Sequence, residues 1–520
     1  MTAADPQASG EPFDVLVVGA GFGGLAAALT LAERGARVCL CETLRYPGGC
    51  ASTFQRGGFR FDAGATLLSG LEPSQPFGRW LSRYAPETRI DWLDPLVELR
   101  APTLTLSTGR TRAALVAELC TLPGAPVSGI RAFFEQQERV ASVLWALFED
   151  PTLLPPFDLR MLARHAARVL DYAAIAPLLG RTLAHVLASH GVAEFAPLRV
   201  YVDALCQITV QCPAAQAEAS FALAAMDYYY RGTGHVQGGV GVLAQALLDG
   251  CSRAGANVQL STRVTGLARC DSEWLATTRR GQVRARTVIA NLLPQALGAL
   301  VGDGASRAES KRLSERGDPL MEGWGAAMLY AVARPPLAAG PGAQHLQLIH
   351  DDGLPFVEGN HVFVSTSSAD ETERAPLGFR TLTMSTHVSL PRLMAAGHDA
   401  GGYIASVHDR MRQTLEARAP EWTALLDRVM TASPRTFARF VGRTSGAVGG
   451  LPRRAGLGNY RSMGPVEALD GLWLVGDSVF PGQSALATAV GGMRTAAAVA
   501  RALGESTSVA SPTPGRAKLR

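Results

Sequence analysis

Short runs of β-branched and apolar residues at both ends of the chain are typical of strands buried on both faces of a parallel sheet. Near the start, residues 14–18 and 37–41 are such runs, and between them apolar residues recur at helical spacing over 25–32. Near the end, residues 471–476 repeat the strand pattern, and an Ala-rich helical pattern follows over 486–503. These patterns predict a strand–helix–strand unit at the start and a strand–helix unit at the end.

The middle of the chain carries further patterns of both kinds. Residues 238–264 read as a glycine turn, an amphipathic helix and a strand, and residues 284–291 predict another buried strand. Apolar residues recur at helical spacing over 133–148 and 159–170. In the second of these helices, arginines line the face opposite the apolar residues. That pattern is typical of a solvated helix over a core or of a helix on an anionic membrane surface.

The turn after the first strand contains Gly19, Gly21 and Gly24 in G-x-G-x-x-G spacing. The first glycine permits a tight turn, the second lets the backbone approach a pyrophosphate, and the third lets helix and strand pack closely. Glu42 ends the second strand, where a carboxylate accepts hydrogen bonds from a ribose diol. The spacing predicts a Rossmann-like dinucleotide site, and the acid favours FAD or NAD over NADP.

The residues that follow favour a flavin. Glycine-rich backbone continues through residues 47–54 and 58–66, as expected where a bulky isoalloxazine lies against the main chain. Asp477 follows the strand near the C-terminus, where its carboxylate would bond a ribityl hydroxyl or, alternatively, only cap the next helix. Val264 is expected over the adenine. The other expected FAD contacts are Gly48, Gly49, Gly64, Ala65, Gly476, Gln483, Ser484 and Ala485.

The sequence therefore predicts an α/β fold in which a FAD-binding, Rossmann-like domain of the glutathione-reductase type is interleaved with an α+β domain for substrate and membrane contact. The FAD-binding domain is expected to be discontinuous, and it comprises residues 12–100, 231–300 and 445–505. Residues 101–230 and 301–444 are left for the substrate domain. Residues 1–11 and 506–520 read as flexible tails.

Composition narrows the function classes. Of the 520 residues, 47% are hydrophobic and 18% are charged, which excludes disorder for most of the chain. The net charge of +4 is small, so no nucleic-acid partner is expected. The eight cysteines have no metal-ligand spacing, and no metal is expected. Neither a secretory leader nor a transmembrane helix is expected.

Seven stretches spread over nearly the whole chain resemble the phytoene desaturase and carotenoid isomerase family of FAD-dependent oxidoreductases, and they occur in the family's order. They read VVGAGFGGLAAALTLAERG, PGGCASTF, GFRFDAGAT, GGVGVLAQAL, SADETERAPLGF, VGGLP and LWLVGDSVFPGQ. PGGCASTF and the extension GATLLSGLEP are most similar to the carotenoid 3′,4′-desaturase branch, whereas GDS-FPGQ is shared with the cis–trans isomerase branch.

The resemblance implies a carotenoid substrate and peripheral attachment to the cytoplasmic side of the cell membrane. The expected reaction is hydride transfer to flavin N5, which introduces a double bond at C-3′,4′ of a lycopene-type or 1-hydroxylated carotenoid. A quinone or oxygen would be the final acceptor. The family has a basic residue where Gln237 stands here. Gln237, Trp324 and Thr66 are candidates for the cavity that faces the flavin, and no catalytic acid or base is assigned.

Three alternatives stay open at this stage. A carotenoid cis–trans isomerase would use reduced FAD without net loss of hydrogen. An amine oxidase of the same fold typically needs a lysine near flavin N5, but the chain has only Lys311, in a charged run that reads as exposed, and Lys518 in the tail. A carotenoid or lipid carrier without a flavin would not need the FAD motifs.

Overall fold

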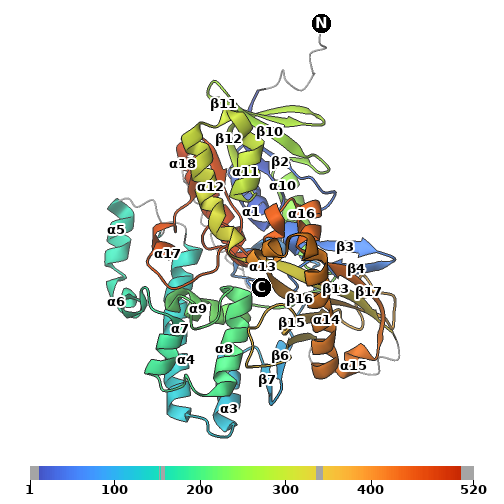
Figure 1. Ribbon diagram of the computed structural model, residues 1–520. Coiled ribbons are helices and arrows are strands. Elements are labelled where there is room, and N and C mark those ends of the chain that lie inside the picture. Colours follow the sequence, from blue (N-terminus) through green and yellow to red (C-terminus); the bar gives the residue numbers. More distant parts are fainter. Residues whose placement is uncertain (1–10, 151–152, 154–158, 335–343, 505–520) are drawn as a thin grey trace, which may run out of the picture.

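The computed structural model describes residues 11–150, 153, 159–334 and 344–504. Figure 1 shows three parts: a first sheet with flanking helices at the top, a second sheet at the lower right, and a layer of helices at the lower left. The predicted tails, 1–11 and 506–520, lie outside the described residues apart from Glu11. The predicted mixed α/β class is confirmed.

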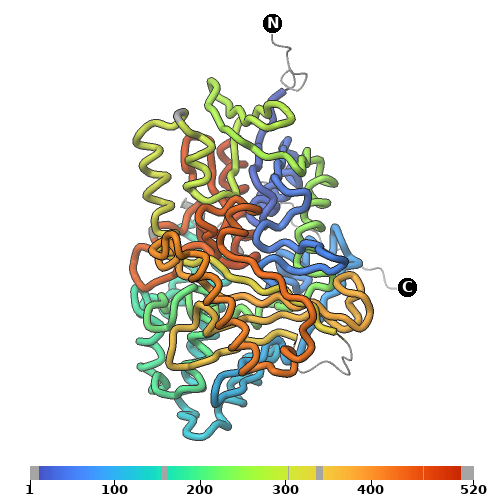
Figure 2. Tube along the Cα trace, turned by 45° about the vertical axis from the view of Figure 1, so that its right-hand side comes forward, coloured from blue at the N-terminus to red at the C-terminus, as the bar shows by residue number. Residues whose placement is uncertain are grey.

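The first sheet has eight strands drawn from three separated parts of the chain. In its centre β9, β2, β1, β12 and β19 run parallel in that order, the β10–β11 hairpin continues antiparallel from β12, and β18 pairs with β19. The strands are β1 (Phe13–Val18), β2 (Val38–Cys41), β9 (Asn257–Gln259), β10 (Val264–Cys270), β11 (Glu273–Thr278), β12 (Gly281–Ala290), β18 (Val466–Leu469) and β19 (Leu472–Leu474). Figure 2 shows these blue, green and red segments lying side by side.

Both faces of the first sheet are buried, which explains the uninterrupted apolar runs. Val15 and Val17 of β1 face one core, whereas Leu16 and Val18 face a second core with the β10–β11 hairpin. The first core includes residues of α1 (Phe22–Ala32), α2 (Pro76–Tyr84), α10 (Gly241–Arg253) and α18 (Ala485–Ala502), and it continues into helices between residues 112 and 225. The helices of the second core are α11 (Pro294–Val301) and α12 (Arg307–Met321).

The second sheet has seven strands in the order β17-β13-β16-β15-β14-β6-β7, antiparallel except for the β14–β6 pair. One face is an apolar core covered by α14 (Ala400–Arg418) and α15 (Pro420–Thr423). The strands are β6 (Val97–Ala101), β7 (Leu104–Thr108), β13 (Trp324–Ala333), β14 (His345–Ile349), β15 (His361–Thr366), β16 (Arg380–Ser389) and β17 (Leu426–Ala432).

The helical layer lies between residues 112 and 225. It consists of α3 (Arg112–Thr121), α4 (Val127–Glu149), α5 (Leu159–Ala166), α6 (Val169–Tyr172), α7 (Leu183–Ser189), α8 (Ala196–Thr209) and α9 (Ala219–Ala225). The helix expected over 133–148 lies within α4. The helix expected over 159–170 is instead broken into α5 and α6, because Arg168 leaves the helical conformation at φ −110° and ψ 10°.

Two predicted domain boundaries differ from the observed sheets. The first predicted segment ends at residue 100, but β6 already belongs to the second sheet. The second ends at residue 300, but α12 continues the first domain because Leu313 is buried against Leu297 and Val301. The remaining elements are β3 (Thr53–Arg56), β4 (Phe59–Asp62), β5 (Ile90–Asp91), β8 (His235–Val236), α13 (Leu390–Ala395), α16 (Pro434–Val441), α17 (Gly458–Arg461) and several 3₁₀ turns.

Candidate functional site

A cavity of about 640 Å³ lies where the parallel strands of the first sheet end. Val18 of β1, Cys41 of β2 and Asn291, which follows β12, all line it, as does Val475 after β19. Ligands of open α/β sheets bind beyond the carboxyl ends of the strands. The cavity is therefore placed where the strand order predicts a cofactor site.

The glycine turn shapes one end of the cavity. Gly19 has a φ of +98°, and Gly21, Phe22 and Gly23 line the cavity at the N-terminus of α1. No side chain caps this N-terminus, so its N–H groups are available to an anion. Gly24 does not line the cavity. An added Cβ there would lie 2.1 Å from the carbonyl oxygen of Gly19, so Gly24 is needed for packing.

Glu42 lies at the edge of the cavity, directly after β2. Its Oε2 accepts a hydrogen bond from the Ala20 N–H at 2.7 Å, and its Oε1 accepts one from the Leu44 N–H at 2.8 Å. Burial raises the pKa of the carboxyl group, and the backbone N–H groups of Leu44, Ala20 and Thr43 counteract that shift only in part. Each oxygen keeps acceptor capacity beyond its backbone bond, as a ribose diol requires.

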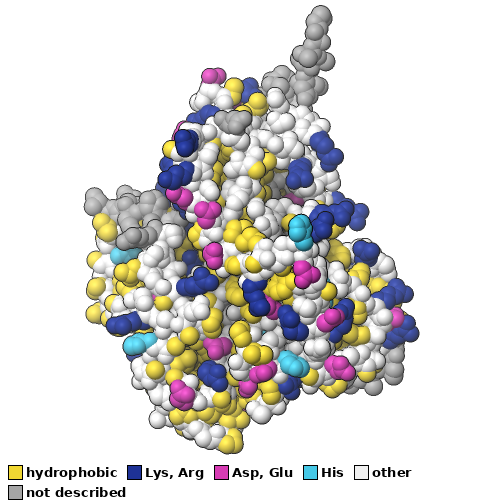
Figure 3. Space-filling model, in the orientation of Figure 1, with side chains coloured by type: hydrophobic (Ala, Val, Ile, Leu, Met, Phe, Trp, Pro, Cys, Tyr) yellow, Lys and Arg dark blue, Asp and Glu magenta, His cyan; other side chains and the backbone are white. Residues whose placement is uncertain are grey.

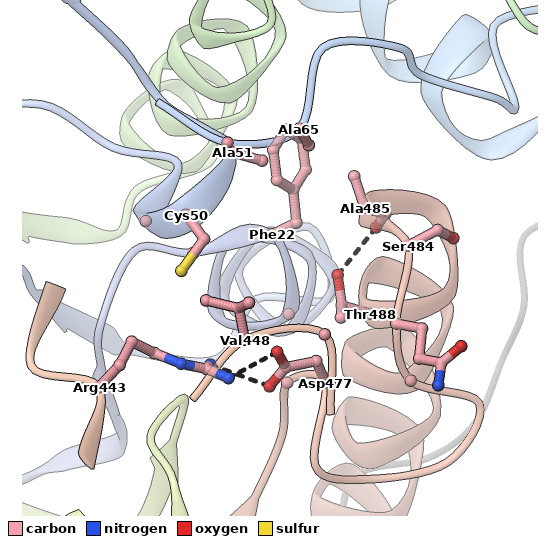
Figure 4. A pocket seen from close by; sticks show the side chains of 18 of the residues that line it. Phe22, Cys50, Ala51, Ala65, Arg443, Val448, Asp477, Ser484, Ala485 and Thr488 are labelled. Carbon is pink, nitrogen blue, oxygen red and sulfur yellow. Dashed lines mark hydrogen bonds and ion pairs between the residues drawn. The ribbon is translucent and has the colours of Figure 1, made fainter. Parts of the chain in front are cut away.

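Asp477 is held by Arg443, a residue that the sequence analysis did not identify. Nη1 and Nη2 of Arg443 donate to Oδ1 and Oδ2 of Asp477 at 2.9 and 2.7 Å. Both residues line the cavity, and Figure 4 shows the pair with Val448 beside it. Burial opposes the charge of Arg443, but Asp477 outweighs this effect and raises the pKa of the guanidinium. Asp477 is not a helix cap, because Ser484 caps α18.

The other predicted FAD contacts converge on the same cavity. Figure 4 shows Ala65 and Ala51 from the N-terminal segment near Ser484 and Ala485 at the start of α18. The predicted residues that line the cavity are Gly19, Gly21, Glu42, Gly48, Gly49, Gly64, Ala65, Val264, Gly476, Asp477, Gln483, Ser484 and Ala485. Segments more than 400 residues apart in the chain therefore meet at one site.

An apolar part of the cavity extends from this site toward the helical layer and the second sheet. Phe148 of α4 and Phe221 of α9 pack against Phe480, with ring centroids 5.2 and 5.7 Å apart. Further lining residues from these parts are Trp145, Ile208, Ala224, Ala225, Tyr228, Tyr229, Ala326, Met328 and Phe363. Such a surface suits a long apolar ligand.

The three candidates for the flavin-facing wall have different positions. Thr66 lines the cavity, and its Oγ1 accepts a hydrogen bond from Ser365 at 2.6 Å. Gln237 is not among the lining residues, because its Nε2 donates to both carboxylate oxygens of Asp91. Trp324 is not among them either, since its Nε1 donates to the Gln211 carbonyl at 2.8 Å. The prediction that Gln237 and Trp324 line the cavity is therefore wrong.

The residues of the cavity fit a dinucleotide. An added Cβ at Gly21 would lie 2.5 Å from Nδ2 of Asn291, so the open N-terminus of α1 depends on the absence of a side chain. Glu42 and Asp477 provide carboxylates at two further points of the same cavity. These three features suit the pyrophosphate and the two polyol parts of a flavin dinucleotide.

Three further features concern a membrane span, a metal site and the amine oxidase alternative. Across the described part of the chain, no helix is long and apolar enough to cross a membrane. No cluster of His, Cys, Asp and Glu suited to a metal occurs within the same residues. Lys311 is exposed on α12 and pairs with Glu315, so it does not provide the lysine that an amine oxidase site requires.

Comparisons with known proteins agree with this site. Residues 17–84 match the model of an NAD(P)-binding Rossmann-like domain. The chain is 26% identical over 522 residues to prolycopene isomerase 2 of an Oncidium hybrid cultivar, covering 95% of the chain and 85% of that protein. It is 32% identical over 258 residues to a phytoene dehydrogenase of Streptomyces griseus, covering 49% of each.

Solved structures share the fold. An oxidoreductase from Methanosarcina mazei superposes with a TM-score of 0.60 at 18% identity, covering 92% of this chain and 98% of that one. Cyclohexylamine oxidase from Brevibacterium oxydans superposes with a TM-score of 0.61 at 15% identity, covering 95% of this chain and 100% of that one. The fold and the cavity define an oxidoreductase with a Rossmann-like dinucleotide-binding domain. In sequence, its homologues are prolycopene isomerases and phytoene desaturases, which confirms the resemblance noted from the motifs.

Proposed function

We propose that the protein is an FAD-dependent carotenoid desaturase. It introduces a C–C double bond into a polyene, at C-3′,4′ of a lycopene-type or 1-hydroxylated carotenoid. The observation that carries the proposal is the single cavity in which a dinucleotide site continues into an aromatic, apolar compartment. The names of its homologues indicate that they act on prolycopene and phytoene, and both of these compounds are polyenes.

The residues that would hold the cofactor follow from the site. The N-terminus of α1 at Gly21 binds the pyrophosphate, Glu42 binds the adenosine ribose, and Asp477 binds a ribityl hydroxyl. Two hydrogen bonds from Arg443 hold the carboxylate of Asp477 in a fixed orientation. When bound, the flavin supplies the acceptor for a hydride from an allylic carbon.

The chain's own contribution is positioning and exclusion of water. Phe148, Phe221 and Phe480 form a contiguous aromatic wall that a planar polyene can lie against. The cation that develops on hydride loss is delocalised along the polyene, so its stabilisation does not require a carboxylate in contact with the substrate. Alignment of the bond over the flavin then determines the rate.

Redox-neutral cis–trans isomerisation is the second candidate. It is favoured by one observation: the relatives that align over 95% of this chain are prolycopene isomerases, whereas the phytoene dehydrogenase aligns over 49%. Product mass separates the two reactions. Desaturation removes two hydrogens from the carotenoid, and isomerisation leaves its mass unchanged.

The enzyme is further proposed to attach peripherally to the cytoplasmic side of the cell membrane and to pass its electrons to a quinone or to oxygen. Leu162, Val169 and Leu170 on α5 and α6 are 53%, 62% and 86% exposed, and Leu179 and Leu457 are exposed as well. Figure 3 shows apolar side chains on the flank where Figure 1 places α5 and α6. Such a patch, with arginines among the leucines, suits a bilayer surface from which a polyene is taken up.

Expression in cells that make lycopene-type or 1-hydroxylated carotenoids tests the function. We expect a product that is two hydrogens lighter and absorbs at longer wavelength. Expression with and without oxygen, followed by assays with a soluble quinone, identifies the acceptor. A product of unchanged mass with altered double-bond geometry would favour the isomerase, and an unchanged carotenoid pool would contradict both.

A further inference from the structure

The ring of Phe480, in the aromatic wall of the cavity, is in contact with two arginines. The Cζ atoms of Arg453 and Arg494 each lie 5.4 Å from its centroid, and Arg453 also lies 5.9 Å from the centroid of the Phe221 ring. Both arginines are buried, with exposed fractions of 6% and 3%. Two positive charges are therefore held next to an apolar compartment, where water solvates them poorly.

The protein supplies few polar partners for these two charges. Nη2 of Arg453 donates to the Pro481 carbonyl at 3.1 Å, and Nη2 of Arg494 donates to the Met463 carbonyl. Within the described part of the chain, no carboxylate forms an ion pair with either guanidinium. Burial lowers the pKa of each to about 10, so both side chains stay charged at neutral pH.

This arrangement differs from that of Arg443, another arginine of the cavity wall. Arg443 faces Asp477, so the two charges cancel. Arg453 and Arg494 instead face carbonyl groups and aromatic rings. Contacts with aromatic rings return part of the free energy that a buried charge costs, but a well-placed opposite charge returns more. An anion near Phe480 would therefore be stabilised by both arginines.

Arg453 belongs to a segment that packs directly against the proposed flavin site. An added Cβ at Gly450 would lie 2.0 Å from the Asp477 carbonyl oxygen, and Nε2 of Gln483 donates to the Leu451 carbonyl at 2.9 Å. Arg453 itself lines the cavity together with Asp477 and Gln483. The arginine is thus next to the strand end and the helix start that are expected to hold the flavin.

Arg494 acts from behind this wall. It lies within α18, whose first residues line the cavity, but Arg494 is not among the lining residues itself. Its guanidinium is separated from the cavity by the Phe480 ring. Buried charges are screened little by water or salt, so this charge acts on the cavity without touching what is bound there.

We propose that Arg453 and Arg494 stabilise the negative charge that the bound flavin gains on reduction, and that they thereby raise its reduction potential. A flavin that accepts a hydride gains two electrons and one proton, which leaves one negative charge on it. Fixed charges near the ring are a means by which a protein tunes a flavin. The inference rests on the flavin of the proposed function but not on the choice of carotenoid reaction, because desaturation produces the reduced flavin and isomerisation uses it.

The two arginines also repel the positive charge that hydride loss leaves on a polyene. That charge spreads along the whole conjugated chain and so away from Phe480, whereas the negative charge stays on the flavin. The attraction therefore acts at shorter range than the repulsion, and Coulomb energy falls with distance. The balance favours hydride transfer to the flavin.

The reduction potential of the full-length, flavin-loaded protein tests this role, measured against a reference dye without any carotenoid. We expect the wild-type potential to lie above that of free FAD. Arg453→Met and Arg494→Met are each expected to lower the equilibrium constant for two-electron reduction by about tenfold, or about 30 mV in potential. Because Arg494 does not line the cavity, its variant removes a charge near the flavin without removing a contact with it.

Arg454→Met is the matched control. Arg454 directly follows Arg453 but is exposed, so the variant loses the same charge at a position where water and salt screen it. We expect its equilibrium constant for reduction to stay within about twofold of the wild-type value. Flavin content is measured on every preparation.

A wild-type potential at or below that of free FAD would overturn the proposal, and this result does not depend on the folding of any variant. Equilibrium constants within about twofold of the wild type in both methionine variants would overturn it as well. Lower flavin content with an unchanged potential would show that the arginines only help to hold the cofactor. If no carotenoid reacts, the proposed function fails, and the potentials still decide the role of Arg453 and Arg494.

Discussion

Arg443 and Asp477 form a two-point ion pair at the wall of the cavity, with N–O distances of 2.9 and 2.7 Å. Their side chains are 15% and 14% exposed, so neither charge is well solvated by water. A carboxylate in such a place is held in one orientation by the fixed cation that faces it. The pair therefore links the loop after α16 to the strand end that carries the proposed ribityl contact.

The first prediction concerns this pair. Arg443→Met leaves Asp477 buried without its partner, and we expect a loss of about 3–5 kcal/mol in the free energy of unfolding and a lower flavin content. Chemical denaturation and the ratio of flavin to protein absorbance measure the two effects. The double variant Arg443→Met/Asp477→Asn is expected to regain stability but not flavin. Full flavin content in the double variant would show that Asp477 does not hold the cofactor.

The second prediction concerns the apolar compartment. Ala225 lines the cavity beside the aromatic wall, and a phenylalanine there would fill space that a polyene needs. We expect Ala225→Phe to keep its flavin and to lose at least about tenfold in carotenoid turnover, because the two parts of the cavity are distinct. Flavin content and product formation are measured on the same preparation. Unimpaired turnover would place the substrate elsewhere.

The third prediction follows from two buried histidines. Burial lowers the pKa of His361 to about 3 and that of His387 to about 4. An unfolded histidine titrates near 6.5, so between about pH 6.5 and 4 the unfolded chain binds more protons than the folded protein. Stability therefore falls as the pH falls through this window, by up to about 1.4 kcal/mol per pH unit for each histidine.

Urea denaturation at several pH values measures this slope. His361→Gln removes one of the two groups, so its stability is expected to fall less steeply than that of the wild type between pH 6.5 and 4. His185, which is exposed on α7, offers the control His185→Gln, whose slope should match the wild type. Equal slopes in all three proteins would refute the assignment to His361.

The fourth prediction concerns the exposed leucines on α5 and α6. Leu170 is 86% exposed, and Leu170→Glu places a negative charge in the patch that is proposed to contact the bilayer. We expect its binding to vesicles of anionic phospholipid to fall by at least about tenfold in a flotation assay. Leu377 is 80% exposed outside this patch, so Leu377→Glu is the matched control and should bind as the wild type does. Equal loss in both variants would argue against a role for the patch.

The dinucleotide site could be predicted from the sequence because its determinants are local. Gly19, Gly21 and Gly24 lie within one turn, and the strand before them is apolar because both of its faces are buried. Arg443 could not be predicted, because its partner lies 34 residues away and the contact depends on how two loops pack. Gln237 was misplaced for a similar reason: its partner Asp91 lies 146 residues away.

The second sheet shows a different limit of sequence patterns. The alternation in His345–Ile349 is typical of a strand with one face in water. In the structure both faces are buried, and the polar face meets Thr66 and His235 from other parts of the chain. Alternation alone does not distinguish a solvated face from a buried polar one, so the partners of this polar face are seen only in the tertiary structure.

A single-turnover experiment tests the proposed desaturation most directly. Purified, oxidised, flavin-loaded protein is mixed without oxygen with a lycopene-type carotenoid in vesicles, and flavin absorbance and carotenoid mass are followed together. We predict that the flavin is bleached and that an equal amount of carotenoid, two hydrogens lighter, is formed. A flavin that stays oxidised beside a carotenoid of unchanged mass would contradict this prediction.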